Sequence, residues 1–120
     1  ATIDYELFTR NRMNVPRMLA EAGVTIACRP TLRRIAANED FRREMAELVK
    51  CGLDADVAKK AMTLHAAQAL GLDYRLGSIE KGKDANLLIL DGDILDVGTR
   101  ICSVMIEGKT VYENPWGKAQ

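Results

Sequence analysis

Apolar residues in the first part of the chain recur at the three- and four-residue spacing of amphipathic helices. In the segment NVPRMLAEAG, one helix face carries four of them: Val15, Met18, Leu19 and Ala22. We expect Asn14 to cap this helix and Pro16 to stand in its first turn, where no backbone donor is needed. Gly23 is expected to end the helix in a left-handed conformation.

The same spacing predicts three further helices between residues 38 and 71. We expect N-caps at Asn38, Asp54 and Thr63, and helix ends at Gly52 and Gly71. The buried stripes of the first two are expected to be Phe41, Met45, Leu48 and Val49, and Val57, Ala58, Ala61 and Met62. The first 71 residues are therefore expected to be mainly helical.

One short apolar run interrupts these helices. Residues 24–28 read VTIAC, a β-branched segment without strict alternation, which is typical of a strand buried on both faces of a parallel sheet. Because a helix leads into it through a single glycine, the pair resembles half of an α/β repeat.

From residue 76 onward, glycine-punctuated turns separate short apolar segments. We expect residues 85–90 to form a strand. In the run ICSVMIEGK, the side chains of Cys102, Val104 and Ile106 are expected to face one way in a second strand. Residues 108–109 are expected to form a tight turn into a third strand.

Composition fits an ordinary soluble globular protein, with 48% apolar and 28% charged residues, and 120 residues make one domain or a piece of one. The 17 basic and 17 acidic residues cancel, so no overall field favours nucleic acid or anionic lipid. No apolar run approaches the ~20 residues that span a bilayer. The segment ATIDYELFTR lacks the features of a secretory signal.

The three cysteines, Cys28, Cys51 and Cys102, are odd in number and widely spaced. This pattern argues for reduced thiols and a cytoplasmic location. Cys28 and Cys102 fall in predicted strands, where we expect them to be buried by packing.

His65 is the only histidine, and its functional interpretation is a metal ligand or a general base. No Cys, His, Asp or Glu stands four residues before or after it, so it lacks a local metal partner. We therefore favour the alternative, a capping or surface hydrogen bond.

Two charged clusters each have a functional and a structural interpretation. Asp91, Asp93 and Asp96 suggest calcium, but the twelve-residue loop with a terminal bidentate glutamate is missing, which favours solvated turn residues. An arginine cluster suggests phosphate or nucleic acid, but it lacks interleaved aromatic residues and is followed by glutamates, which favours a solvated helix face. This cluster comprises Arg29, Arg33, Arg34, Arg42 and Arg43.

The stretch GSIEKGKDANLLILDGDILD, residues 77–96, resembles the C-terminal signature of the amidohydrolase superfamily of metal-dependent hydrolases, especially its imidazolonepropionase-related branch. AEAGVTIA, residues 20–27, resembles the segment that enters the last barrel strand of that family. The resemblance covers about residues 13–112. The matching residues of the signature are Thr63, Leu64, Ala66, Leu70, Gly71, Gly77, Ser78, Glu80, Gly82, Lys83, Asp84, Ala85, Leu87, Asp91, Gly92, Asp93, Leu95, Asp96, Gly108, Val111 and Tyr112.

This resemblance implies an α/β fold. Residues 1–71 would be the last helix, strand and helices of a TIM-like barrel, and residues 72–120 the C-terminal strands of a small composite β-sandwich. Residues 87–90 would then fill the core of the sandwich. The intact family binds a divalent, zinc-like metal.

The resemblance also implies one metal-binding aspartate, just after the final barrel strand. Thr31 stands about there, and threonine supplies neither a carboxylate ligand nor a proton-accepting group. The other family metal ligands would lie upstream of this sequence. We therefore expect no catalytic, metal-binding or cofactor-binding residue in this chain.

Two functional hypotheses follow from the resemblance. In the first, the chain is the C-terminal segment of a hydrolase acting on C–N bonds of the cyclic amide type, inactive alone. In the second, it is a degenerate, non-catalytic relative that serves as a binding or assembly module. Under either hypothesis we expect self-association, or completion by the missing N-terminal part, and neither nucleic acid nor membrane as partner. A third, disfavoured hypothesis is nucleic-acid binding through the arginine cluster.

Overall fold

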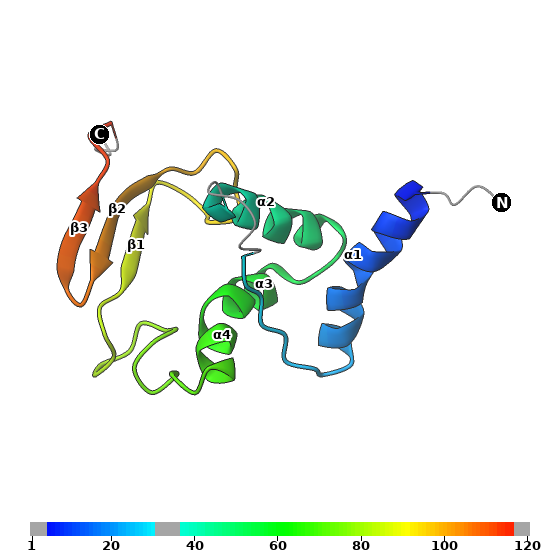
Figure 1. The fold of residues 1–120 in the computed structure, drawn as a ribbon, viewed down its shortest axis with the longest axis horizontal. Coiled ribbons are helices and arrows are strands. Elements are labelled where there is room, and N and C mark those ends of the chain that lie inside the picture. Colours follow the sequence, from blue (N-terminus) through cyan, green and yellow to red (C-terminus); the bar gives the residue numbers. More distant parts are fainter. Residues whose placement is uncertain (1–4, 31–36, 117–120) are drawn as a thin grey trace.

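The computed structural model describes residues 5–30 and 37–116. Four helices come first in the chain and a three-stranded sheet follows (Figure 1). Helix α1 lies at one end of the molecule, the sheet at the other, and α2, α3 and α4 between them (Figure 1). The elements are α1 (Tyr5–Glu21), α2 (Ala37–Lys50), α3 (Ala55–Met62), α4 (Leu64–Ala69), β1 (Leu87–Leu90), β2 (Ile101–Ile106) and β3 (Lys109–Glu113).

A small hydrophobic core forms where α2 meets α3. Met45 of α2 is only 1% exposed, Ala58 and Ala61 of α3 are fully buried, and Leu53 joins them from the intervening turn. The rest of the two predicted stripes packs, partly buried, against this cluster: Phe41, Leu48, Val49, Val57 and Met62. Both stripes predicted from the apolar spacing are therefore confirmed.

The helix ends follow the glycines. Gly23 has a φ of +84°, and the Val24 N–H donates to the Leu19 carbonyl at 2.9 Å, as in a Schellman motif. Gly52 and Gly71 end α2 and α4 with positive φ in the same way. All three predicted helix ends are confirmed.

Of the three predicted N-caps, one is confirmed, one holds its position without a side-chain cap bond, and one is wrong. Asp54 caps α3 as expected, because its Oδ1 accepts two backbone N–H groups of the first turn at 2.9 and 3.1 Å. Thr63 holds the N-cap position of α4, but its hydroxyl instead donates to the Lys59 carbonyl at 2.8 Å, because α3 runs directly into α4. The Asn38 prediction is wrong, since α2 already begins at Ala37.

Helix α1 is longer than predicted. It begins at Tyr5, so Asn14 and Pro16 both lie inside it and neither marks its start. The side that contacts the core carries Ala20. Val15, Met18 and Leu19, on the predicted apolar face, are 47%, 58% and 42% exposed. The apolar face exists, but the described residues do not cover it.

Residues 24–28 do not form a strand, contrary to the prediction. A parallel strand exists only as one member of a hydrogen-bonded pair, and no described segment supplies the neighbour. Ile26 and Cys28 instead pack against the core, and the Cys28 N–H donates to the Ala61 carbonyl at 3.0 Å. The parallel sheet that this segment suggested is therefore absent from the described part of the chain.

The three strands form an antiparallel sheet in the order β1–β2–β3. Leu88 lies opposite Val104, which lies opposite Tyr112, so these three side chains share one face. The turn between β2 and β3 is formed by Glu107 and Gly108, one residue earlier than predicted. Their φ values of 49° and 78° are both positive, as a type I′ hairpin requires.

Neither face of this sheet is fully covered. Leu88 and Ile89 are neighbours on β1, so they point to opposite faces, and they are 52% and 48% exposed. The described residues contain one sheet and no second layer, so the expectation that residues 87–90 fill a sandwich core stays a prediction. Cys102 lies half-buried in β2, and all three cysteines are free thiols.

The loop that connects α4 to β1 is closed by hydrogen bonds between Arg75 and Asp84. Arg75 Nε donates to Asp84 Oδ2 at 2.9 Å, and the Asp84 N–H returns to the Arg75 carbonyl at 2.9 Å. Inside this loop, Lys83 Nζ lies 2.6 Å from Ser78 Oγ and 2.8 Å from Glu80 Oε2. Residues 75–84 are therefore an ordered loop rather than an extended linker.

Candidate functional site

The acidic cluster forms the loop between β1 and β2. Asp93 and Asp96 each accept a hydrogen bond at 2.9 Å from the backbone N–H two residues ahead. Asp91 accepts from the backbone N–H and from Nε of Arg100 at 2.7 and 2.8 Å. These bonds hold the pKa of Asp91 below its usual value. The aspartates act as turn residues, as the sequence interpretation favoured.

Asp93 also ties this loop to the helices. Lys59 Nζ of α3 donates to Asp93 Oδ2 at 2.7 Å. This hydrogen bond lowers the pKa of Asp93 and raises that of Lys59. The pair is partly exposed, with 38% of the lysine and 51% of the aspartate side chain accessible, so it contributes little stability by itself.

The arginine cluster is divided by the structure. Arg42 is half-buried and donates to the carbonyl oxygens of Ile94, Asp96 and Thr99 at 2.9, 2.9 and 3.0 Å. The interpretation as a solvated helix face is therefore wrong for Arg42. It fits Arg43, which is exposed on the same helix.

Two other arginines of the cluster, Arg33 and Arg34, lie outside the described residues, and Arg29 is exposed. No sequence signal pointed to the bonds made by Arg42, because its acceptors stand more than fifty residues further along the chain.

His65 makes a hydrogen bond, as the favoured interpretation expected, but this bond is partly buried and is neither a helix cap nor a surface contact. Its Nδ1 lies 3.1 Å from the carbonyl oxygen of Ile26, so α4 is attached to the segment that leaves α1. A carbonyl only accepts, so Nδ1 carries the proton in this bond. His65 thus serves as a link between two segments.

Thr31, where the resemblance places the metal-binding aspartate, lies outside the described residues. The approach to it is described as far as Pro30 and follows the core through Ile26 and Cys28. Burial raises the pKa of the Cys28 thiol, which makes it a poorer metal ligand and nucleophile at neutral pH.

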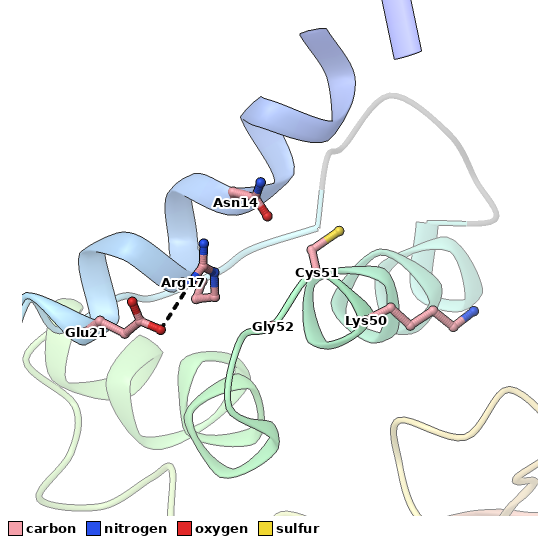
Figure 2. Close-up of a pocket in the computed structure, with 6 residues that line it drawn as sticks. All are labelled: Asn14, Arg17, Glu21, Lys50, Cys51 and Gly52. Atoms are coloured by element: carbon pink, nitrogen blue, oxygen red, sulfur yellow. Dashed lines mark hydrogen bonds and ion pairs between the residues drawn. The ribbon is translucent and has the colours of Figure 1, made fainter. Parts of the chain in front are cut away.

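A cavity of about 530 Å³ lies between α1 and the end of α2 (Figure 2). In this view Asn14 and Arg17 extend from α1 toward the turn that holds Cys51, whereas Lys50 extends away from them (Figure 2). Arg17 is paired with Glu21 at 3.4 Å. The cavity is lined by Asn14, Arg17, Glu21, Lys50, Cys51 and Gly52.

Cys51 in this cavity has no histidine base beside it, because the single histidine of the sequence is bound to Ile26 instead. The carboxylate of Glu21 is directed at Arg17 (Figure 2).

The described residues also do not fit the divalent metal that the resemblance implies. Within residues 5–30 and 37–116, no group of three or more His, Cys, Asp or Glu side chains is placed to hold a metal ion. The aspartates nearest to one another are already engaged in turn and ion-pair contacts.

Within residues 5–30 and 37–116, no helix is both long and apolar enough to cross a membrane.

Comparison with known proteins assigns the chain to a family. Residues 4–111 match the sequence model of the Amidohydrolase family. The chain is 35% identical over 72 residues to the amidohydrolase tasK of Hapsidospora irregularis, covering 60% of this chain and 7% of that protein. It is 46% identical over 43 residues to the imidazolonepropionase of Picrophilus torridus, covering 36% of this chain and 11% of that protein.

A solved structure agrees with these matches. An amidohydrolase from Thermotoga maritima MSB8 superposes with a TM-score of 0.79 at 30% identity, covering 85% of this chain and 26% of that one. The chain therefore spans about a quarter of the solved relative and far less of the two curated relatives. Because the family match extends over most of its length, the chain belongs to the Amidohydrolase family.

Proposed function

We propose that this chain is the C-terminal segment of a hydrolase that acts on C–N bonds of the cyclic amide type, and that it is inactive alone. The observation that carries this proposal is the difference between the length of this chain and the length of a whole amidohydrolase. Most of the chain superposes on a quarter of an amidohydrolase, while its described residues present no group that could hold a metal ion.

In this proposal the two parts of the chain belong to two different units of the family fold. Residues 1–71 belong to the end of a TIM-like barrel, and residues 72–120 to a composite β-sandwich. Two features support the division: the helices precede the sheet in the chain, and the boundary falls just before the closed loop of residues 75–84. The metal and the proton-transferring groups would come from the rest of the fold.

The chain's own contribution would then be structural. His65 and Ala61 hold residues 24–28 against the helices, and those residues lead toward Thr31. Arg42 and Lys59 hold the loop after β1. These contacts support a larger site without supplying a reacting group.

A second candidate is a degenerate, non-catalytic relative that serves as a binding or assembly module. Thr31 favours it, because a threonine at the position of the family aspartate removes a carboxylate from the expected metal site.

The test combines an intact-mass measurement of the protein from its native source with metal analysis and turnover of a cyclic amide panel. The hydrolase proposal expects a longer native form that binds a divalent metal stoichiometrically and hydrolyses a panel member, while the 120-residue chain does neither. A longer native form without bound metal or turnover would favour the non-catalytic relative. Turnover by the 120-residue chain would overturn both.

A further inference from the structure

The cavity between α1 and the end of α2 is separate from the position where the resemblance places a metal ligand. None of the described residues 24–30, which lead toward Thr31, lines it. Asn14, Arg17 and Glu21 are spaced three and four residues apart, so they line it from one face of α1 (Figure 2). The volume of about 530 Å³ is within the range of sites that bind small molecules.

One cationic and one anionic group stand side by side in this cavity. Arg17 and Glu21 lie one turn apart on α1, and their 3.4 Å contact is longer than the distance of about 2.7–2.9 Å in a strong charged hydrogen bond. Lys50 is engaged elsewhere, because it bonds to Glu47 at 3.2 Å and extends away from Arg17 (Figure 2). A ligand that carries one negative and one positive charge therefore matches the cavity.

The same side chains have unused hydrogen-bonding groups. A guanidinium has five N–H donors and a carboxylate has two oxygens, whereas the Arg17–Glu21 contact uses only Nη1 and Oε1. Among the described residues, neither side chain has a further partner, and the amide of Asn14 has none. A polar ligand can therefore bind without breaking an existing contact.

Gly52 fixes the position of the Arg17 side chain. A Cβ added at Gly52 would lie 2.6 Å from Cδ and 3.3 Å from Nε of Arg17, so that side chain lies directly against the Gly52 backbone. The guanidinium is thus positioned before a ligand arrives, which lowers the entropic cost of binding.

We propose that this cavity binds the ring-opened product of the hydrolase, a linear amino acid with a carboxylate at one end and an ammonium at the other. This inference rests on the proposed function and adds a product site outside the reacting centre. When water cleaves the C–N bond of a cyclic amide, the hydroxyl joins the carbonyl carbon and a hydrogen joins the nitrogen. A proton then passes from the new acid to the new amine, so the product carries both charges.

The two charges of the product bind to different side chains. Arg17 donates its free N–H groups to the carboxylate, and Glu21 accepts from the ammonium. The intact cyclic amide is neutral and offers neither charge, and a simple carboxylic acid offers only one. The cavity should therefore prefer the ring-opened amino acid over both.

Binding to the 120-residue chain tests the inference, because the described lining residues all belong to it. Isothermal titration calorimetry at low ionic strength, where exposed charges are least screened, compares 5-aminopentanoate with its cyclic amide, piperidin-2-one, and with pentanoate. We expect 5-aminopentanoate to bind at least tenfold more tightly than either. Equal binding of pentanoate would show a plain anion site, and absence of binding by 5-aminopentanoate would likewise overturn the inference.

Cys51 provides a second readout, since it lines the cavity and is a free thiol. Saturating 5-aminopentanoate should slow its labelling by iodoacetamide at least threefold. Labelling of Cys102, which lies in β2 of the sheet, should not change. Unaltered labelling of Cys51 at saturation would place the ligand elsewhere and contradict the proposal.

Charge-removing variants identify the groups that bind. Glu21→Gln should weaken binding of 5-aminopentanoate at least fivefold without weakening that of pentanoate, whereas Arg17→Gln should weaken both. Glu44→Gln is the matched control, because Glu44 is exposed on α2 and does not line the cavity. Thermal unfolding of each variant confirms that it folds, and an equal loss of affinity in Glu44→Gln would refute the assignment.

The outcomes separate this inference from the proposed function. If the longer native form hydrolyses the cyclic amide but the cavity does not bind 5-aminopentanoate, the inference is wrong and the hydrolase proposal stands. If binding is selective and depends on Glu21, while the longer form shows no turnover, the amino-acid site is upheld and the hydrolase proposal fails.

Discussion

Arg42 Nε donates to the carbonyl oxygen of Ile94 at 2.9 Å, joining helix α2 to the loop that follows β1. The Nη2 atom of the same side chain adds bonds to Asp96 and Thr99, so one guanidinium satisfies three carbonyls. The aspartates of this loop accept hydrogen bonds that fix its turns, and these turns direct the three carbonyl oxygens toward Arg42. Leu95, between the acceptors, packs against the hydrophobic core.

Replacing Arg42 should therefore loosen the sheet from the helices. We expect Arg42→Gln to lower the free energy of unfolding by about 2 kcal/mol, because charge-assisted bonds to partly buried carbonyls are lost. Arg42→Lys should recover only part of this, because an ammonium group cannot match the planar fork. Urea denaturation measures both. Arg43→Gln, on the exposed side of α2, is the control, and an equal loss there would show that the three bonds contribute nothing.

Gly77 and Gly82 form a matched pair for separating backbone strain from crowding. Both have a φ of +94°, but an added Cβ at Gly77 would lie 2.7 Å from the Ala67 Cβ and 2.9 Å from the Leu64 Cα, whereas Gly82 faces open space. Gly82→Ala should cost about 1 kcal/mol for the left-handed backbone alone. Gly77→Ala should cost a further 1–3 kcal/mol or so. Similar thermal unfolding of the two variants would contradict this packing.

The loop aspartates predict sensitivity to acid. The pKa of Asp91 is lowered by the backbone and side chain of Arg100, and that of Asp93 by Lys59. Both carboxylates therefore stabilise the fold above the pKa of the unfolded chain, and this stabilisation is lost as the pH falls through the folded pKa, below about pH 4. Urea midpoints between pH 7 and pH 3 should fall at the acid end. Asp91→Asn should flatten that fall, and an unaltered pH profile would refute the assignment.

Cys28 should be slow to react with alkylating agents. Burial raises its pKa, so the thiolate fraction at neutral pH is smaller than in the unfolded chain. The rate of iodoacetamide labelling, followed by peptide mass spectrometry, should reach half its maximum at a pH above the ordinary value of about 8.5. Labelling in urea gives the reference pH profile of the unfolded chain. A folded-state midpoint at or below the midpoint of that reference would disprove the burial effect.

Much of the fold could be predicted because the responsible forces act locally. The spacing of Met45 and Ala58 placed the core, and Gly23 marked a helix end, since each depends on neighbours within one or two turns. Residues 24–28 were misassigned because a strand needs a partner elsewhere in space. Arg42 could not be predicted, since helix periodicity says nothing about acceptors on a distant loop.

The family could be predicted for a different reason. The stretch from Gly77 to Asp96 carries a recognisable order of turns and apolar residues, and the match over residues 4–111 confirms that resemblance. The candidate site was harder to predict. Thr31 lies outside the described residues, and the contact of His65 depends on a backbone carbonyl that carries no sequence signal.

The closed loop between Arg75 and Asp84 makes this region suitable for protein engineering. Because its two ends are bonded to each other, the distance between α4 and β1 does not depend on how long the loop is. A fluorescent or affinity tag grafted between Lys81 and Gly82, both exposed, would enlarge the loop without pulling the sheet away. The chain thus provides a point of attachment far from helix α1 (Figure 1).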